Sequence, residues 1–275
     1  MSDATKFDFK NSGNRVAQVY EELLVPRIFV PWANLLLTEA KLSAGESVLD
    51  VACGPGTVAR MASERVGAKG KVTATDISPP MLDIARAKPH SPNGAPIEYV
   101  ESPAHPLKVD DASFDVTVCQ QGLQFFPEKI EALKEMARAT QPGGRIVVAV
   151  WGSPQQCSIF GEICAGLDEA LPASIADMMK APFSLSDPQQ LKALAGEAGL
   201  KNIEVKTYSL PLVFERGIDQ AIRVLDATPL APQIAEQPPE KQEALAENLK
   251  NRLNQFLNGN ECHSHQVSNI LISRH

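Results

Sequence analysis

Two glycines and two aspartates mark the part of the sequence best suited to bind a ligand. The stretch VLDVACGPGTVAR (48–60) carries Asp50 inside an apolar run, and Gly54 and Gly56 follow it. Glycine lets the backbone approach a ligand closely, and the start of a helix offers unpaired N–H groups. Asp76 ends the next apolar run, where a carboxylate can accept hydrogen bonds from both hydroxyls of a ribose. The pattern predicts a nucleoside cofactor.

More than one kind of cofactor fits a glycine loop at this place. The two glycines, followed by Ala59, permit the fingerprint of a dinucleotide-binding protein. Asp50 disfavours that interpretation, because a charge inside an apolar strand is costly unless it serves the loop or a cationic ligand. Pro55 also disfavours it, because proline removes a backbone donor that a pyrophosphate would use. A tight turn without a ligand is the third interpretation, and the acid at the end of the next strand argues against it.

The elements that must position these residues follow an α/β pattern. Apolar runs alternate with amphipathic ones through the first two-thirds of the chain, which is typical of parallel strands linked by crossover helices. Helices are indicated after Ser78, where two prolines occupy the first turn, and after Asp187, which precedes a proline. The expected strands are 47–52, 71–76, 97–101, 114–119, 145–151, 202–214 and 266–274.

Two segments lie outside this alternation. The N-terminal one has a helical pattern that prolines 26 and 31 are expected to break. The other separates the last two strands and carries apolar residues at helical spacing, and a connection of that length is usually a lid or cap. We therefore predict an N-terminal helical cap segment (1–46), a core (47–215 and 261–275) and a helical lid insertion (216–260).

Four motifs in order carry a resemblance to a known family. They are LDVACGPG, TDISPPMLDIARAK, DDASFDVTVCQQGLQFFPE and LKEMARATQPGGRIVVAVW. The sequence resembles the class I S-adenosylmethionine-dependent methyltransferases. Within that family its motifs are most similar to those of the small-molecule branch around ubiquinone and menaquinone methyltransferases. The resemblance implies a Rossmann-like, doubly wound sheet of seven strands, the last inserted antiparallel beside the fifth. It also implies S-adenosyl-L-methionine as cofactor and S-adenosyl-L-homocysteine as product.

The resemblance also assigns residues to the parts of the cofactor. Pro103 stands where the family often has an Asp that accepts from the adenine amino group, and Ala52 replaces the first glycine of the family loop. The implied cofactor-binding set is Asp50, Ala52, Cys53 and Gly54 around the methionine part, Asp76 on the ribose, Ile77 and Met81 on the adenine, Pro103 and Ala104 beside its amino group, and Gln120 and Gln121 where the cofactor meets the substrate's entry.

The acceptor site is expected to come from parts outside the core sheet. The candidates are Tyr20, Phe29 and Trp32 in the N-terminal segment, Gln124, Phe125 and Phe126 in the GLQFF loop, and the 216–260 insertion. Aromatic side chains suit an apolar or planar small molecule, although ordinary packing is the alternative for each of them. Methyl transfer needs alignment of the reactants and exclusion of water rather than a protein nucleophile. If a base assists, His105 is the candidate, and a surface histidine without a role is the alternative.

Composition limits the partners and the compartment. The net charge of −7 without a basic cluster disfavours nucleic acid and membrane surfaces as partners. The five cysteines are scattered and odd in number, which predicts reduced thiols. CHSH (262–265) has no partner cluster elsewhere, so no metal is expected. The start lacks the pattern of a secretory signal, which favours a cytoplasmic protein, and a monomer or a homodimer is expected.

The same residues bear on three rival functions. A base-flipping amino methyltransferase typically shows an N/D-P-P-aromatic run where this chain has QQGL. A nicotinamide-dependent oxidoreductase is disfavoured by Asp50 and Pro55. A cofactor-binding relative without turnover remains open, because few residues of this family are strictly catalytic.

Overall fold

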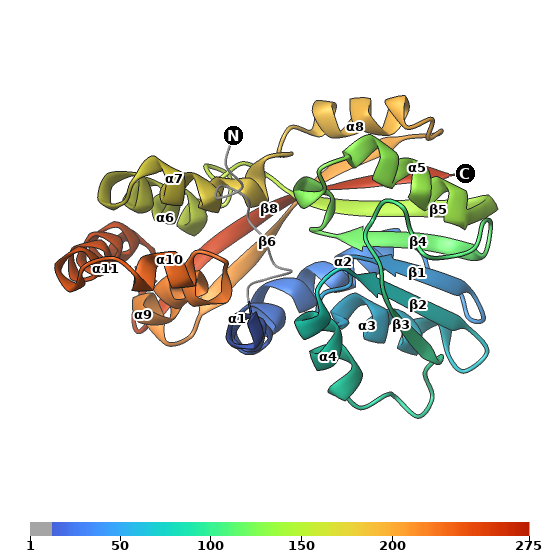
Figure 1. Cartoon of the computed structure of the whole chain (residues 1–275), viewed down its shortest axis with the longest axis horizontal. Coiled ribbons are helices and arrows are strands. Elements are labelled where there is room, and N and C mark those ends of the chain that lie inside the picture. Colours follow the sequence, from blue (N-terminus) through green and yellow to red (C-terminus); the bar gives the residue numbers. More distant parts are fainter. Residues whose placement is uncertain (1–12, 275) are drawn as a thin grey trace.

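One mixed sheet organises the chain. The computed structural model describes residues 13–274, and Figure 1 shows the sheet with helices on both of its faces. Its strand order is β3 (Ile97–Glu101), β2 (Lys71–Asp76), β1 (Ser47–Val51), β4 (Phe114–Gln120), β5 (Thr140–Trp151), β8 (Glu261–Arg274) and β6 (Glu204–Phe214). The first five are mutually parallel, and β8 lies antiparallel between β5 and β6. The predicted Rossmann-like sheet with an antiparallel last strand is therefore confirmed, with β7 (Leu257–Asn258) added as a short hairpin partner of β8.

Each face of the sheet has its own core because successive side chains of a strand point to opposite faces. Val48 packs with one cluster and its neighbour Leu49 with the other. Helices α2 (Val30–Glu39), α3 (Thr57–Val66) and α4 (Pro79–Ala87) cover the Val48 face. Helices α5 (Lys129–Ala139) and α8 (Pro188–Glu197) cover the Leu49 face.

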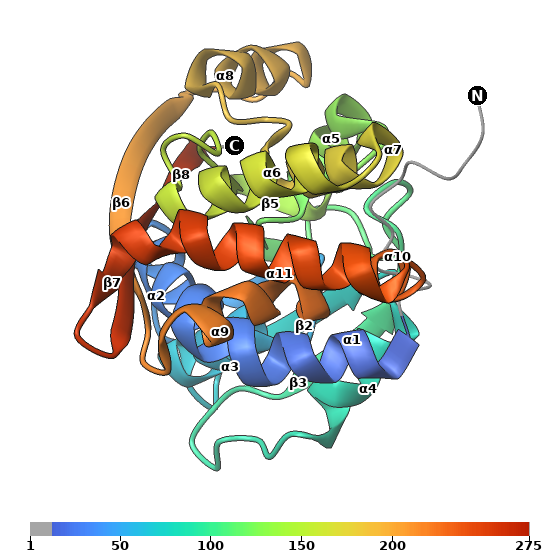
Figure 2. The same ribbon diagram turned by 90° about the vertical axis from the view of Figure 1, so that its left-hand side faces the viewer.

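A third apolar cluster forms a lobe at one end of the sheet. Strands β6 and β8 continue past the last residue of β5 as a two-stranded arm, from Ser209↔Val267 to Phe214↔Cys262. Figure 1 shows helices gathered around this arm, and Figure 2 shows α6 and α11 side by side. The lobe contains α6 (Ser158–Ala170), α7 (Ala173–Ala176), α9 (Gly217–Ile222), α10 (Ala231–Ala235), α11 (Pro239–Leu253) and the short 3-10 turns Asp177–Phe183, Arg223–Ala227 and Asn254–Phe256.

The N-terminal segment is a continuous helix, and the predicted breaks at its prolines are wrong. Helix α1 (Gly13–Val19) passes through a π-helical stretch, Tyr20–Phe29, directly into α2. Pro31 is the second residue of α2 and directly follows the π-helical stretch, so its missing N–H falls where the hydrogen bonding changes from the π-helical to the α-helical pattern. Pro26 lies in the π-helical stretch, where the hydrogen bonding already departs from the α-helical pattern: Val30 N–H donates to Val25 O. Residues 1–12 of the predicted cap segment lie outside the described residues.

Candidate active site

A cavity of about 940 Å³ opens at the carboxyl ends of the parallel strands. Its wall contains Ala52 and Gly54 after β1, Asp76 at the end of β2, and Gln120 at the end of β4. The ligand site of a doubly wound sheet is expected at this edge, where the loops that follow the strands converge. Residues of the N-terminal segment and of the lobe close the rest of the wall.

The glycine loop has the backbone conformation that its sequence predicts. Gly54 and Gly56 have φ of 53° and 74°, in the left-handed region that favours glycine. A Cβ atom on Gly54 would meet no atom within 4 Å, so the loop leaves room for a ligand there. Gly56 is the N-cap of α3. Ala52 also has a positive φ, 57°, which explains physically why a glycine is favoured at that position in related loops.

Asp76 is held by the main chain on both sides. Its Oδ2 accepts from Gly54 N–H at 2.7 Å and its Oδ1 from Ser78 N–H at 2.8 Å. Burial raises the pKa of the Asp76 carboxyl, and these main-chain donors oppose that shift. Each carboxylate oxygen keeps a further lone pair, so the group can accept from a diol while it stays bonded to the loop.

Asp50 is a buried acid with no partner. It is 1% exposed, and neither carboxylate oxygen has a hydrogen-bond partner among residues 13–274. Burial raises its pKa well above the ordinary value, the nearby main-chain N–H of Ala59 opposes this shift in part, and the charge of Asp76 adds to it. A charge in this position is costly unless a ligand compensates it, and a cationic amino-acid moiety would do so. The residues present therefore fit a positively charged nucleoside cofactor.

Apolar side chains lie beside these acids. Ile77 is 44% exposed and is one of few large hydrophobic residues at the described surface. Ile77, Met81, Pro103 and Ala104 all line the cavity, as a planar ring would require. Cys53 is buried and, like Asp50, is not a lining residue.

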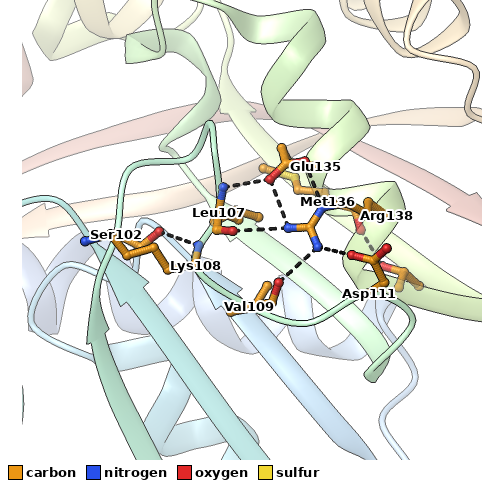
Figure 3. A network of polar contacts seen from close by, with 9 residues as sticks. Ser102, Leu107, Lys108, Val109, Asp111, Glu135, Met136 and Arg138 are labelled. Carbon is orange, nitrogen blue, oxygen red and sulfur yellow. Dashed lines mark hydrogen bonds and ion pairs between the residues drawn. The ribbon is translucent and has the colours of Figure 1, made fainter.

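The loop that carries Pro103, Ala104 and His105 is fastened by a network around Arg138 (Figure 3). The guanidinium donates to Leu107 O at 3.1 Å and to Val109 O at 2.9 Å. It also binds Glu135 through two nitrogens, at 2.8 and 2.9 Å, and pairs with Asp111. Glu135 in turn accepts from Leu107 N–H at 2.7 Å. Helix α5 thus fixes the position of the loop after β3.

Aromatic residues surround the part of the cavity nearest the N-terminal segment. Tyr20 and Phe29 stack with ring centroids 4.7 Å apart, and Phe29 meets Trp151 edge-on at 6.2 Å. All three line the cavity. Trp32 does not: it is 2% exposed and packs edge-on against Trp151 at 5.7 Å.

The loop after β4 contributes its predicted residues to the same wall. Gln121, Gln124, Phe125 and Phe126 line the cavity together with Gln120. His105 lines it from the loop after β3, 36% exposed in its side chain and 3.8 Å from a carboxylate oxygen of Glu128. The structure therefore brings together nearly all of the predicted cofactor and acceptor residues.

The lobe supplies lining residues that the sequence reasoning missed. They are spread over the region 160–266, and no local motif marks them. Gln266 is 3% exposed, but polar and apolar residues are mixed around it in the sequence, so the sequence alone does not mark it as a lining residue. The lining residues that were not predicted include Phe160, Met179, Phe183 and Gln266, whereas Val224 and Thr228 belong to the 216–260 insertion that was expected to contribute to the acceptor site.

The remaining side chains offer little nucleophilic or metal chemistry. All five cysteines are free, as predicted, and all are also buried; burial raises the pKa of Cys119 to about 12. No cluster of three or more metal-ligating side chains occurs within residues 13–274. Within the same range, no helix is long and apolar enough to cross a membrane.

A doubly wound sheet with a glycine loop and a strand-end carboxylate defines a Rossmann-like protein that binds a nucleoside cofactor. The family model described as a methyltransferase domain matches residues 48–144. Demethylmenaquinone methyltransferase of Staphylococcus epidermidis is 31% identical over 192 residues, which cover 65% of this chain and 77% of that protein. The ubiquinone/menaquinone biosynthesis C-methyltransferase of Hahella chejuensis is 34% identical over 155 residues, which cover 56% of this chain and 58% of that protein.

Solved structures agree on the fold. Haemonchus contortus phosphoethanolamine N-methyltransferase 2, in complex with S-adenosylhomocysteine, matches with a TM-score of 0.63 at 17% identity, covering 100% of this chain and 60% of that one. The chain belongs to the class I S-adenosylmethionine-dependent methyltransferases, of the quinone-methyltransferase type. It uses S-adenosyl-L-methionine to methylate a small-molecule acceptor, and the nicotinamide-dependent and non-catalytic alternatives are not favoured.

Proposed function

We propose that the acceptor is a small aromatic ring compound of the quinone type, methylated on a ring carbon. The names of the relatives support this proposal: the S. epidermidis protein is named a demethylmenaquinone methyltransferase and the H. chejuensis protein a C-methyltransferase of ubiquinone/menaquinone biosynthesis. The observation in this chain that supports it is one continuous cavity. That cavity runs from the Gly54 loop to an aromatic wall containing Tyr20, Phe29 and Phe183.

We propose that the residues predicted from the sequence hold the cofactor. Asp76 would accept from the ribose hydroxyls, because its carboxylate is already fixed by Gly54 and Ser78. Asp50 would compensate the cationic amino-acid part from beneath the loop. Ile77 and Met81 would pack on the adenine, with the Pro103–Ala104 main chain at its edge.

Bound S-adenosyl-L-methionine supplies a methyl group on a positively charged sulfur. The residues of the chain then have to align the ring carbon and exclude water, for which effective molarities of roughly 10⁵ to 10⁸ M are known. His105 lines the cavity and is the proposed base for a ring hydroxyl or the ring C–H proton.

We propose that the N-terminal segment (1–46) and the insertion (216–260) act as a cap over a core made of 47–215 and 261–275. Glu21 pairs with Lys88, and the Lys88 ammonium also donates to Pro55 O at 3.4 Å, which ties the N-terminal segment to the glycine loop. From the other side, Val224 and Thr228 reach the cavity. We expect the protein to act in the cytoplasm as a monomer or a homodimer, without nucleic acid or membrane as partner.

Transfer of labelled methyl groups tests this proposal. The protein is incubated with methyl-labelled S-adenosyl-L-methionine and reduced 1,4-naphthoquinone, with 2-methoxynaphthalene as a matched ring without a free hydroxyl. We expect label on a ring carbon of the hydroxylated compound and stoichiometric S-adenosyl-L-homocysteine. Label on oxygen, or transfer only to acyclic amines, would contradict the proposed acceptor class.

A further inference from the structure

Two glutamines of the cavity wall, Gln121 and Gln124, and the fully buried Ser268 behind them form a hydrogen-bonded network. Ser268 Oγ donates to the main-chain oxygen of Val150 at 2.8 Å. The Gln121 amide nitrogen donates to Ser268 Oγ at 3.0 Å. The Gln124 amide nitrogen is 3.4 Å from Gln121 Oε1 and donates to it. This hydrogen-bonded network runs from β5 through β8 to the loop after β4, so it joins elements that are distant in sequence.

The direction of every bond in this chain is set at its main-chain end. A carbonyl oxygen can only accept, so the single hydroxyl proton of Ser268 must point to Val150. Ser268 Oγ can then only accept from Gln121, which turns the Gln121 amide nitrogen toward it and its oxygen toward Gln124. Gln124 must therefore donate to Gln121 through its amide nitrogen. This leaves the amide oxygen of Gln124 as the one atom at the end of the network that makes no hydrogen bond within it.

That oxygen is buried and has no partner. Gln124 is 3% exposed, and within residues 13–274 no group donates to its Oε1. Buried acceptors without a donor are rare in native proteins because they lose their hydrogen bond to water. Gln124 is one of the residues that line the cavity, so a donor group of a ligand bound there is the candidate partner for this oxygen.

The backbone holds this chain of side chains in place. Gln121 has φ of 55°, a left-handed conformation uncommon for glutamine, and its N–H donates to Ala149 O at 2.8 Å. Strained backbone of this kind clusters at ligand sites. The main-chain oxygen of Gln124 accepts from Ser184 Oγ at 3.2 Å. Ser268 itself is fully buried. Rotation of the Gln124 amide by 180° would break its hydrogen bond to Gln121, and the amide nitrogen would gain no other partner in the network.

We propose that Gln124 Oε1 accepts a hydrogen bond from a hydroxyl or N–H group of the acceptor molecule, and that Ser268 is the positioning residue that orients this amide through Gln121. The inference deepens the proposed function and rests on it. The site consequently selects a ring that carries a donor over a ring of the same shape without one. An oxidised ring, whose oxygens are carbonyls, would place two acceptors face to face.

The test is the ratio of affinities for two rings of similar shape. Binding of 2-naphthol and of 2-fluoronaphthalene to the protein loaded with S-adenosylhomocysteine is measured by equilibrium dialysis. We expect the unaltered protein to prefer 2-naphthol by at least about tenfold. Gln124→Leu should abolish the preference, while Gln155→Leu, an exposed glutamine outside the cavity, should keep it.

Ser268 is tested by the same ratio because a merely structural role would lower both affinities together. Ser268→Ala should reduce the preference severalfold, since Gln121 can then turn, and Ser268→Thr, which keeps the hydroxyl, should restore it. Equal affinities in the unaltered protein, or an unchanged ratio in Gln124→Leu, would overturn the inference and leave the proposed function standing. Failure of both rings to bind, together with no methylation of any ring compound, would overturn the proposed function instead.

Discussion

The main-chain N–H of Gly54 donates to Oδ2 of Asp76 over 2.7 Å, which joins the loop after β1 directly to the end of β2. Ser78 N–H holds the other carboxylate oxygen at 2.8 Å. The carboxylate is thus oriented before a ligand arrives, and little ordering of this side chain remains for cofactor binding to impose.

Replacing Asp76 tests its predicted role on the ribose. Asp76→Ala should weaken S-adenosylhomocysteine binding by about 1–3 kcal/mol, the usual cost of losing hydrogen bonds to a charged acceptor. The measurement is calorimetric titration. Glu101→Ala is the matched control, because Glu101 is an exposed carboxylate that pairs in register with Asp76 on the neighbouring strand. Equal losses in both variants would remove the assignment of Asp76.

The buried acid Asp50 should make the stability of the cofactor-free protein depend on pH. Burial raises its pKa above the ordinary value of 3.8, so the folded protein holds the proton to higher pH than the unfolded chain. This contribution is complete below that value and is lost as the pH rises toward the folded pKa. The free energy of unfolding should therefore fall with pH in this interval, and less steeply in Asp50→Asn.

Urea denaturation at a series of pH values measures how steeply the free energy of unfolding changes with pH. Part of the slope should remain in the variant, because burial raises the pKa of Asp76 too. Asp83→Asn is the control at an exposed aspartate, 75% accessible in its side chain, and should follow the unaltered protein. An Asp50→Asn slope identical to that of the unaltered protein would contradict the burial argument.

The network around Arg138 should stabilise the loop after β3. Arg138→Ala leaves two main-chain oxygens and Glu135 without their partner, so the free energy of unfolding should drop by about 1–3 kcal/mol. The amides of Leu107 and Lys108 should exchange hydrogen faster. Lys134→Ala, which removes an exposed pair with Glu131 on the same helix, should cost less than about 0.5 kcal/mol. Unchanged exchange in Arg138→Ala would show that the loop is held by other contacts.

Two glycine-to-alanine substitutions distinguish the effect of tight packing in the lobe on stability from the effect of helix propensity. A Cβ on Gly166 in α6 would lie 2.6 Å from Leu249 Cδ2 and 2.8 Å from Asn248 Oδ1 of α11, so Gly166→Ala should force these two side chains to move and disturb the packing between the helices. Overpacking of this kind costs about 1–3 kcal/mol. Gly196→Ala in α8 meets no atom within 4 Å and should instead gain up to about 1 kcal/mol from helix propensity.

The same pair of variants tests the cap in the methyl-transfer assay. Because α6 and the 224–228 turn both line the cavity, Gly166→Ala should raise the KM for the acceptor while S-adenosylhomocysteine affinity stays the same. Gly196→Ala should change neither. A parallel loss of cofactor affinity in Gly166→Ala would assign the lobe to the cofactor site.

Much of the cofactor side could be predicted from the sequence because its signals are local. The glycines after one strand and Asp76 at the end of the next meet at one sheet edge in any doubly wound sheet, so their contact needs no knowledge of the rest of the chain. Pro26 shows the limit of local rules: proline predicts a break, and a π-helical stretch carries the helix past it.

The acceptor-binding part of the cavity depends on contacts between residues far apart in the sequence, which the spacing of residues along the sequence does not predict. Ser268 and Gln121 are 147 positions apart, and only the antiparallel insertion of β8 beside β5 brings them within hydrogen-bonding distance. Trp32 and Phe29 are equally plausible lining residues by type. The direction in which each side chain leaves the helix decides that Phe29 faces the cavity and Trp32 faces the core.

The measurement that tests the central claim most directly is a calorimetric titration of the purified protein with S-adenosyl-L-methionine, S-adenosyl-L-homocysteine and NADH side by side, followed by the labelled-methyl assay on the reduced naphthoquinone. We predict that the two sulfur compounds bind at one site per chain, that NADH does not bind, and that the label moves to the ring. Binding of NADH alone, or no binding of either sulfur compound, would contradict the assignment of the glycine loop and its two aspartates.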